Sequence, residues 1–93
     1  ERAMSIRLRI QGRVQGVAYR AWLVDRARTY GVNGWVRNRR DGTVEALLDG
    51  KPAGVEAVSR LCETGPSAAR VDRIERTSTE ETGPSGFVQW PSV

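Results

Sequence analysis

The amino-terminal third of the chain changes from a strand pattern to a helix pattern across a turn that contains two glycines. Residues Met4–Gln11 alternate apolar and polar side chains, which is the period of a strand with one buried face. From about Ala18 to Tyr30 the apolar residues recur every three or four positions, and this spacing predicts an amphipathic helix that ends near Gly31. One face of the sheet that contains this strand is therefore expected to be covered.

The rest of the chain carries four more strand signals and one more helix signal. The strands are predicted from apolar or β-branched runs bounded by turn residues: Val32–Asn38, Thr43–Leu48, Ala69–Thr77 and Gly86–Trp90. Asp41-Gly42 is a hairpin signal between the first two of them. Pro52 favours the first turn of the second helix, Val55 and Val58 belong to its apolar stripe, and Gly65-Pro66 ends it.

The order of these elements predicts the fold class. Strand, helix, strand, strand, helix, strand, followed by a short carboxyl-terminal strand, is the βαββαβ order of an α+β, ferredoxin-like split βαβ sandwich. In this fold two helices cover one face of an antiparallel sheet. A chain of 93 residues sustains one hydrophobic core, so residues 4–93 are expected to form a single domain. Residues 1–3, which precede Met4, are expected to be an expression remnant.

Two residue counts exclude whole classes of chemistry. The chain has no histidine and one cysteine, Cys62, so its residues provide no disulfide framework, no Cys/His zinc site and no histidine-based triad or general base. We expect Cys62 to be a small buried hydrophobe, and a lone thiol favours a reducing compartment. No apolar run approaches the about 18 residues of a membrane span and no signal peptide is visible, so we expect a cytoplasmic protein with no membrane partner.

The turn Gly12–Arg20, which reads GRVQGVAYR, is a candidate anion site. Its glycines allow several backbone N–H groups to point inward, and the amino terminus of the following helix adds a partial positive charge. Arg20 adds a guanidinium fork that matches phosphate oxygens. The turn is neither a Walker A loop nor a GxGxxG dinucleotide fingerprint. The alternative is an ordinary strand-to-helix turn that precedes a solvated arginine.

Asn38 is expected to lie beside this turn. In a split βαβ unit the first two strands run parallel with another strand between them, so their carboxyl ends meet at one edge of the sheet. An amide next to a phosphate can accept a hydrogen bond from a water molecule and donate one to a phosphoryl oxygen, so Asn38 is a candidate for holding an attacking water. The alternative is that Asn38 is a turn residue ahead of Asp41-Gly42.

Two segments of the chain together resemble the acylphosphatase family. Gly12–Arg20 matches that family's Gly-x-Val-Gln-Gly-Val-x-Phe/Tyr-Arg loop. Gly34–Asn38 matches its Gly-x-Val-Arg/Lys-Asn motif, and Asp41–Glu45 matches the Asp-Gly-x-Val-Glu that follows. The resemblance extends over most of the chain, with Ala18 and the carboxyl-terminal Trp90–Val93 departing from the family pattern.

This resemblance implies a hydrolase that splits acyl phosphates into a carboxylate and inorganic phosphate, with no metal, no cofactor and no phosphoenzyme. Arg20 would bind phosphate and Asn38 would position the attacking water. The cradle for the phosphate would be the backbone of the loop, at Gln15, Gly16, Val17, Ala18 and Tyr19. The implied partners are a small-molecule acyl phosphate and an inorganic phosphate or similar anion in the loop, and one domain of this kind is expected to be a monomer.

The residues present suit this reaction. The carboxylate that leaves an acyl phosphate has a conjugate acid with a pKa of about 4, so no general acid is required. Phosphoryl transfer of this kind is catalysed mainly by positioning and by electrostatic stabilisation from N–H groups and a guanidinium. A chain without histidine is adequate for it.

Two other functions remain open at the level of sequence. The excess of 15 Lys and Arg over 11 Asp and Glu, a net charge of +4, also fits a ferredoxin-like RNA-binding module. Such modules stack bases on aromatic residues of the central strands, and Thr43–Leu48 has none, so no nucleic-acid partner is expected. The second alternative is a domain that binds carbamoyl or acyl phosphate without hydrolysing it.

Overall fold

The computed structural model describes residues 2–93, so Glu1, part of the expected expression remnant, lies outside the described residues. The elements in chain order are β1 (Met4–Arg13), α1 (Tyr19–Thr29), β2 (Asn33–Asn38), β3 (Val44–Gly50), α2 (Pro52–Cys62), β4 (Arg70–Ser78) and β5 (Phe87–Gln89). All the elements predicted from sequence are present in the predicted order, and the strand bounds agree to within two residues. The last strand is shorter than the expected Gly86–Trp90.

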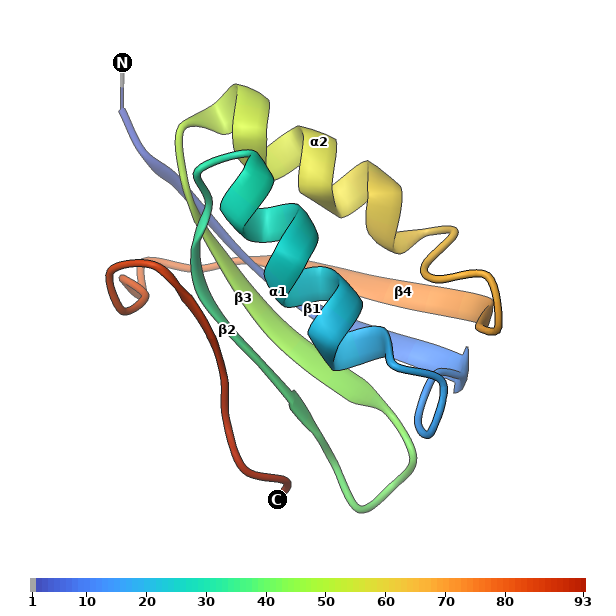
Figure 1. The fold of residues 1–93 in the computed structure, drawn as a ribbon. Coiled ribbons are helices and arrows are strands. Elements are labelled where there is room, and N and C mark those ends of the chain that lie inside the picture. The colour runs from blue at the N-terminus through green and yellow to red at the C-terminus, as the bar shows by residue number, and fades with distance from the viewer. Residues whose placement is uncertain (1) are drawn as a thin grey trace.

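The strands form one sheet with the order β4-β1-β3-β2-β5. β3 lies between β1 and β2 and is antiparallel to both, so β1 and β2 run in the same direction. β4 pairs antiparallel with β1, and β5 pairs parallel with β2. Both helices pack on the same face of the sheet (Figure 1). The ferredoxin-like α+β fold predicted from the order of elements is confirmed.

The core lies between the helices and the sheet. The alternation in β1 directs Ile6, Leu8 and Ile10 toward the helices, where all three are buried. Leu23 of α1 and Val55 of α2 are buried against them as the helical spacing predicts. At full burial each such side chain contributes about 2 kcal/mol, so this layer accounts for much of the stability of the fold.

A buried contact joins the start of α1 to the end of α2. The Tyr19 hydroxyl donates a hydrogen bond to the backbone oxygen of Cys62 at 2.6 Å, and both residues are buried. Burial raises the pKa of the Cys62 thiol to about 12, so the thiol stays protonated inside the core. Cys62 is a structural residue, as expected from the helix pattern.

The helix-free face of the sheet carries a cluster of ion pairs around Glu45, a carboxylate on β3 that is 4% exposed. Arg7, Arg37 and Arg39 each place a guanidinium nitrogen within 2.8–2.9 Å of its oxygens. Burial raises the pKa of this carboxyl, but hydrogen bonds from Arg37 and Arg39 outweigh it and hold the pKa below its ordinary value. The cluster therefore ties β1, β2 and β3 together by charge.

Two stacked tryptophans lie next to this cluster. The rings of Trp35 and Trp90 are 4.6 Å apart between centroids and 8° from parallel. The Arg37 guanidinium lies 4.8 Å from the Trp35 ring centroid, within the range of a cation–π contact. Trp35 is buried under this stack, so it serves packing on the open face rather than a ligand cage.

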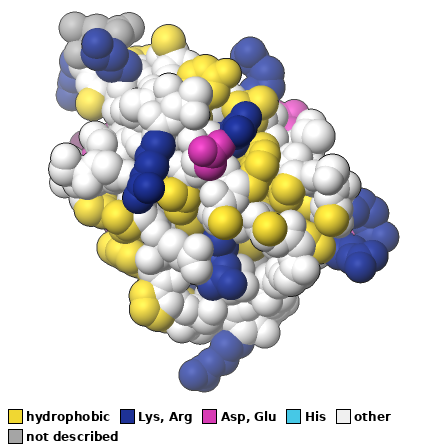
Figure 2. All heavy atoms as spheres, viewed as in Figure 1, with side chains coloured by type: hydrophobic (Ala, Val, Ile, Leu, Met, Phe, Trp, Pro, Cys, Tyr) yellow, Lys and Arg dark blue, Asp and Glu magenta, His cyan; other side chains and the backbone are white. Residues whose placement is uncertain are grey.

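On the helix-bearing face the Lys and Arg side chains are dispersed and do not form one patch (Figure 2). No helix of residues 2–93 is long and apolar enough to cross a membrane.

Candidate active site

The turn between β1 and α1 has the backbone shape of an anion cradle. Gly16 has φ +74° and Ala18 has φ +64°, while Val17 between them does not have a positive φ. Where a left-handed residue adjoins a right-handed one, successive N–H groups face one concave side, and two left-handed residues two positions apart are compatible with such a curl. Gly16 adopts this conformation at no steric cost, whereas Ala18 adopts it with its Cβ in place.

Helix α1 begins directly at this turn without a cap. Among residues 2–93 no side chain caps its first turn by a hydrogen bond, and that turn contains no acidic residue. The first N–H groups of a helix have no acceptor within the helix, so they are available to an external anion, and the helix dipole adds to their attraction. Arg20 is the second residue of the helix and brings its guanidinium to the same end.

A cavity of about 130 Å³ lies against this turn and helix end. Its lining comes from the turn, the first residues of α1, and the ends of β2 and β5: Val14, Gly16, Ala18, Tyr19, Arg20, Ala21, Asn38 and Gln89. Arg20 and Asn38, far apart in the sequence, therefore face one space. In Figure 1 the turn after β1 and the hairpin after β2 lie at the same end of the molecule. The parallel course of β1 and β2 is the reason for this convergence.

Two polar side chains of the cavity lining keep groups without a protein partner among residues 2–93. The Asn38 Oδ1 atom is buried and accepts no hydrogen bond from any residue of 2–93. Arg20 takes part in none of the ion pairs formed by the same residues. A buried acceptor without a donor is costly unless water or a ligand fills the space. The cavity is therefore suited to a small polar guest.

The residues of the predicted cradle contribute in different ways. Gly16, Ala18 and Tyr19 line the cavity, but the Tyr19 ring is buried in the core, so only its backbone is available to an anion. Val17 packs its side chain against the core and does not line the cavity. Gln15 does not line it either, because its side-chain amide binds the hairpin after β2.

Gln89 of β5 is a cavity residue that sequence reasoning missed. β5 runs parallel to β2, with Gln89 opposite Val36, and this pairing brings Gln89 to the mouth of the site. The strand signal at Gly86–Trp90 located the element, but no pattern in the sequence specified its partner or its register.

The segment after β5 holds the backbone of Asn38. The Val93 N–H donates to the Asn38 oxygen at 3.0 Å, and the Arg40 N–H donates to a backbone oxygen of Val93 at 2.7 Å. Trp90 N–H donates to the Val36 oxygen at 2.9 Å in the same alignment. The carboxyl-terminal residues therefore brace the end of β2 that carries the candidate water-holding side chain.

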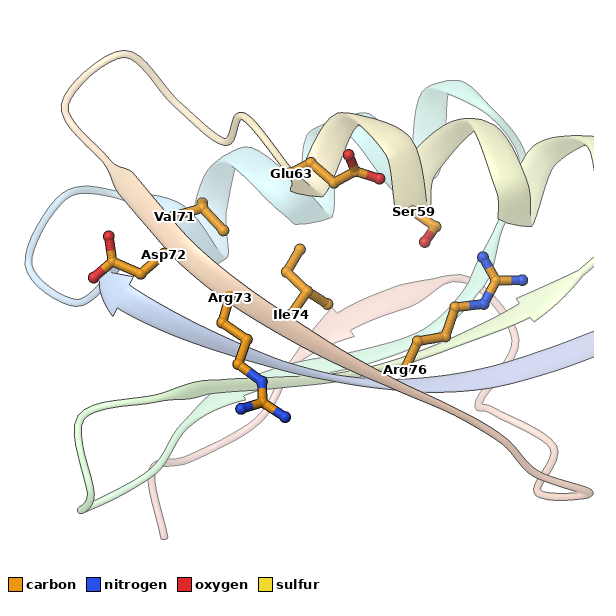
Figure 3. Close-up of a pocket in the computed structure, with 7 residues that line it drawn as sticks. All are labelled: Ser59, Glu63, Val71, Asp72, Arg73, Ile74 and Arg76. Atoms are coloured by element: carbon orange, nitrogen blue, oxygen red, sulfur yellow. The ribbon is translucent and has the colours of Figure 1, made fainter.

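A larger cavity of about 410 Å³ lies elsewhere, between α2 and β4. Figure 3 shows Ser59 and Glu63 on the helix side and Val71 and Ile74 pointing toward the helix from the strand side. Its charged lining residues are of both signs and it contains none of the predicted site residues, so it offers no comparable anion cradle. Within residues 2–93 no three Asp, Glu or Cys side chains are grouped to hold a metal ion.

Comparisons with known proteins identify the family of this chain. Residues 6–89 match the family model described as Acylphosphatase. An acylphosphatase of Rhodospirillum rubrum is 51% identical over 86 residues, covering 92% of this chain and 94% of that protein. The crystal structure of an acylphosphatase from Bacillus subtilis matches with a TM-score of 0.89 and 30% identity, covering 94% of this chain and 98% of that one.

A structure of full-length HypF in a phosphate- and nucleotide-bound form also matches, with a TM-score of 0.90 and 25% identity over 98% of this chain but 12% of HypF. The family match spans nearly the whole chain, and the Rhodospirillum rubrum relative is similar over 94% of its own length. This chain belongs to the acylphosphatase family and is an enzyme that hydrolyses acyl phosphates.

Proposed function

We propose that the enzyme cleaves its substrate by in-line attack of water on a phosphoryl group held in the turn between β1 and α1. The backbone N–H groups from Gln15 to Tyr19 and the Arg20 guanidinium bind the phosphoryl oxygens. Asn38 holds the water, accepting a hydrogen bond through Oδ1 and donating one through its NH₂ group to a phosphoryl oxygen. The acyl oxygen leaves as a carboxylate without being protonated.

The observation that carries this proposal is that Asn38, whose buried Oδ1 has no hydrogen-bond partner among residues 2–93, lines the same cavity as Arg20. A turn residue of the ordinary kind would direct its oxygen to a nearby backbone N–H. Here the hairpin is closed instead by Asp41, whose Oδ1 accepts hydrogen bonds from the backbone N–H and the hydroxyl of Thr43. The Asn38 side chain is therefore left free to hold water.

The acidic residues near the hairpin support a mechanism without a general acid. Hydrogen bonds from Thr43 lower the pKa of Asp41, and the arginine cluster lowers that of Glu45. Both carboxylates therefore stay ionised at neutral pH and have no proton to give. Stabilisation must come from positioning, the N–H groups and the guanidinium, which is sufficient when a carboxylate leaves.

Phosphate release from carbamoyl phosphate and from an aromatic acyl phosphate tests the proposal. Arg20→Ala is expected to lose substrate affinity and turnover together, and Asn38→Ala to lose chiefly turnover. Arg20→Lys keeps the charge but not the fork, so it should also be impaired. Nearly full activity in Arg20→Lys would refute the bidentate contact, and nearly full activity in Asn38→Ala would refute the water-holding role.

We further propose that the enzyme works as a cytoplasmic monomer. All the residues assigned to the reaction come from one chain, and the buried, protonated thiol of Cys62 suits a reducing compartment. Sedimentation at working concentration tests the monomer directly, and a dimer that dissociates with loss of activity would contradict it.

A further inference from the structure

The side chain of Gln15 makes contacts that the proposed mechanism does not use. Its Nε2 atom donates to the backbone oxygen of Arg39 at 2.7 Å and to that of Thr43 at 2.9 Å. Among residues 2–93 these are the side-chain hydrogen bonds that join the β1–α1 turn to the hairpin between β2 and β3. Arg39 directly follows β2 and Thr43 directly precedes β3, so one amide group is hydrogen-bonded to both arms of the hairpin.

These bonds decide what Gln15 is able to do. A glutamine NH₂ group has two hydrogens, and both are committed to backbone oxygens. The atom that remains is Oε1, an acceptor, which has no attraction for the oxygens of a phosphoryl group. The side chain of Gln15 therefore does not bind the substrate directly, although its backbone belongs to the proposed cradle.

The two hydrogen bonds of the Gln15 side chain form a bridge between the phosphate cradle and the hairpin that follows Asn38. Each end of this bridge is next in sequence to a residue of the proposed site. Gln15 directly precedes Gly16, the first left-handed residue of the cradle. Arg39 directly follows Asn38, and its own N–H donates to the Thr43 oxygen at 2.9 Å. The Gln15 amide therefore donates to the same Thr43 oxygen that closes the hairpin. A displacement of either partner would change the separation between the phosphoryl group and the water.

We propose that Gln15 is a positioning residue that sets the distance and angle between the phosphate cradle and the water held by Asn38. This inference rests on the proposed function. Attack in line requires the water oxygen and the phosphorus atom to be held about 3 to 3.5 Å apart and aligned, and a 1 Å misplacement costs about 100-fold in rate. Binding of phosphate alone requires only the turn and Arg20, so it does not depend on the bridge.

The test compares turnover with phosphate binding in Gln15→Met and Gln15→Glu. Both changes keep the length of the side chain and remove its donors. We expect kcat to fall by about tenfold to 100-fold, while the inhibition constant of inorganic phosphate changes by less than about twofold. Gln11→Met is the matched control, because Gln11 makes one exposed hydrogen bond, to Glu75, and neither residue lines the cavity. It should leave both quantities unchanged.

Gln15→Glu adds a readout that a purely structural role would not move. A protonated carboxyl has one O–H donor, so lowering the pH should restore part of kcat in this variant but not in Gln15→Met. The comparison is made on folded protein, checked by circular dichroism, and Gln15→Glu at low pH keeps the test valid if Gln15→Met does not fold.

Unchanged kcat in both variants would overturn the proposal, and so would a parallel loss of turnover and phosphate binding, which would make Gln15 a phosphate ligand. Failure of the proposed function would give a different result. In that case the Asn38→Ala variant would have the same kcat as the unaltered enzyme, whatever the Gln15 variants do.

Discussion

Two arginine-containing regions of this enzyme, the helix-free face of the sheet and the start of α1, differ in what surrounds the charge. On the helix-free face, Arg7, Arg37 and Arg39 converge on Glu45, so their charge is compensated inside the fold. At the amino-terminal end of α1, Arg20 has no acidic partner among residues 2–93 and lines the same cavity as Asn38, beside the first N–H groups of the helix. Other arginines of the described chain also lack a carboxylate partner, so the proposed role of Arg20 depends on its place at this cavity as well as on its free charge.

Exchange of the arginine tests this comparison most severely. Arg20→Ala should lower kcat/KM by about 1000-fold, since it removes a charge that stabilises the transferred phosphoryl group. The matched change Arg37→Ala should leave kcat/KM within about threefold and instead lower stability, since it opens the Glu45 cluster and the stack on Trp35. Steady-state assays and urea unfolding of both variants measure the two effects. A larger activity loss in Arg37→Ala would reverse the assignment.

Removal of the side chain proposed to hold the water should have the next largest effect. Asn38→Ala is expected to reduce kcat by about 100-fold, since the water loses both its orientation and its distance. The change in stability should be small, because Asn38 Oδ1 makes no hydrogen bond within the described chain. Single-turnover phosphate release, read beside thermal unfolding, checks this. A drop in stability with kcat preserved would identify Asn38 as a turn residue.

Changes in the Glu45 cluster on the helix-free face should alter stability rather than rate. Glu45→Gln keeps the shape of the side chain but leaves the arginines around it without a negative partner. We expect a loss of about 2 kcal/mol in the free energy of unfolding, with kcat nearly unchanged. Urea denaturation followed by tryptophan fluorescence measures it. An equal stability for the variant would mean that the cluster contributes nothing net.

Acid should reveal the same cluster in the unaltered protein. The folded state holds the pKa of Glu45 below its ordinary value of 4.5, so the folded state binds fewer protons than the unfolded chain. The stabilisation is complete above pH 4.5 and is lost as the pH falls through the folded pKa. The free energy of unfolding of Glu45→Gln should depend less on pH in that range.

The rate of hydrolysis should be flat between about pH 5.5 and 7, since the chain has no histidine to titrate there.

The smallest expected effect concerns the cradle itself. Ala18 holds φ +64°, a conformation that glycine adopts more easily. Ala18→Gly should therefore raise the free energy of unfolding by about 0.5 kcal/mol and leave the affinity for phosphate nearly unchanged. Calorimetric unfolding and phosphate inhibition report the two quantities. A clear loss of affinity would show that the Ala18 Cβ helps to keep the turn in its binding shape.

Much of this molecule follows from local patterns. The alternation in Met4–Gln11 specifies which residues of β1 face the helices, and the order of elements specifies that β1 and β2 run parallel. Arg20 and Asn38 could be expected at one edge for that reason, whereas their roles remain predictions.

Other features depend on tertiary placement that no local pattern encodes. The amide of Gln15 finds its acceptors on a hairpin more than twenty residues away, which appears only once the sheet is assembled. The position of Gln89 depends on the parallel register of a strand of three residues, too short to carry a periodic signal. An alanine gives no indication of a left-handed backbone, so the conformation of Ala18 was also hidden.

The central claim is that Arg20 binds phosphate and Asn38 positions the water. Inhibition of hydrolysis by inorganic phosphate tests it most directly. In the proposed mechanism inorganic phosphate occupies the cradle but needs no attacking water. We expect the inhibition constant to rise at least about tenfold in Arg20→Ala and to stay within about twofold in Asn38→Ala. An inhibition constant raised by Asn38→Ala and unchanged by Arg20→Ala would contradict the assignment of both residues.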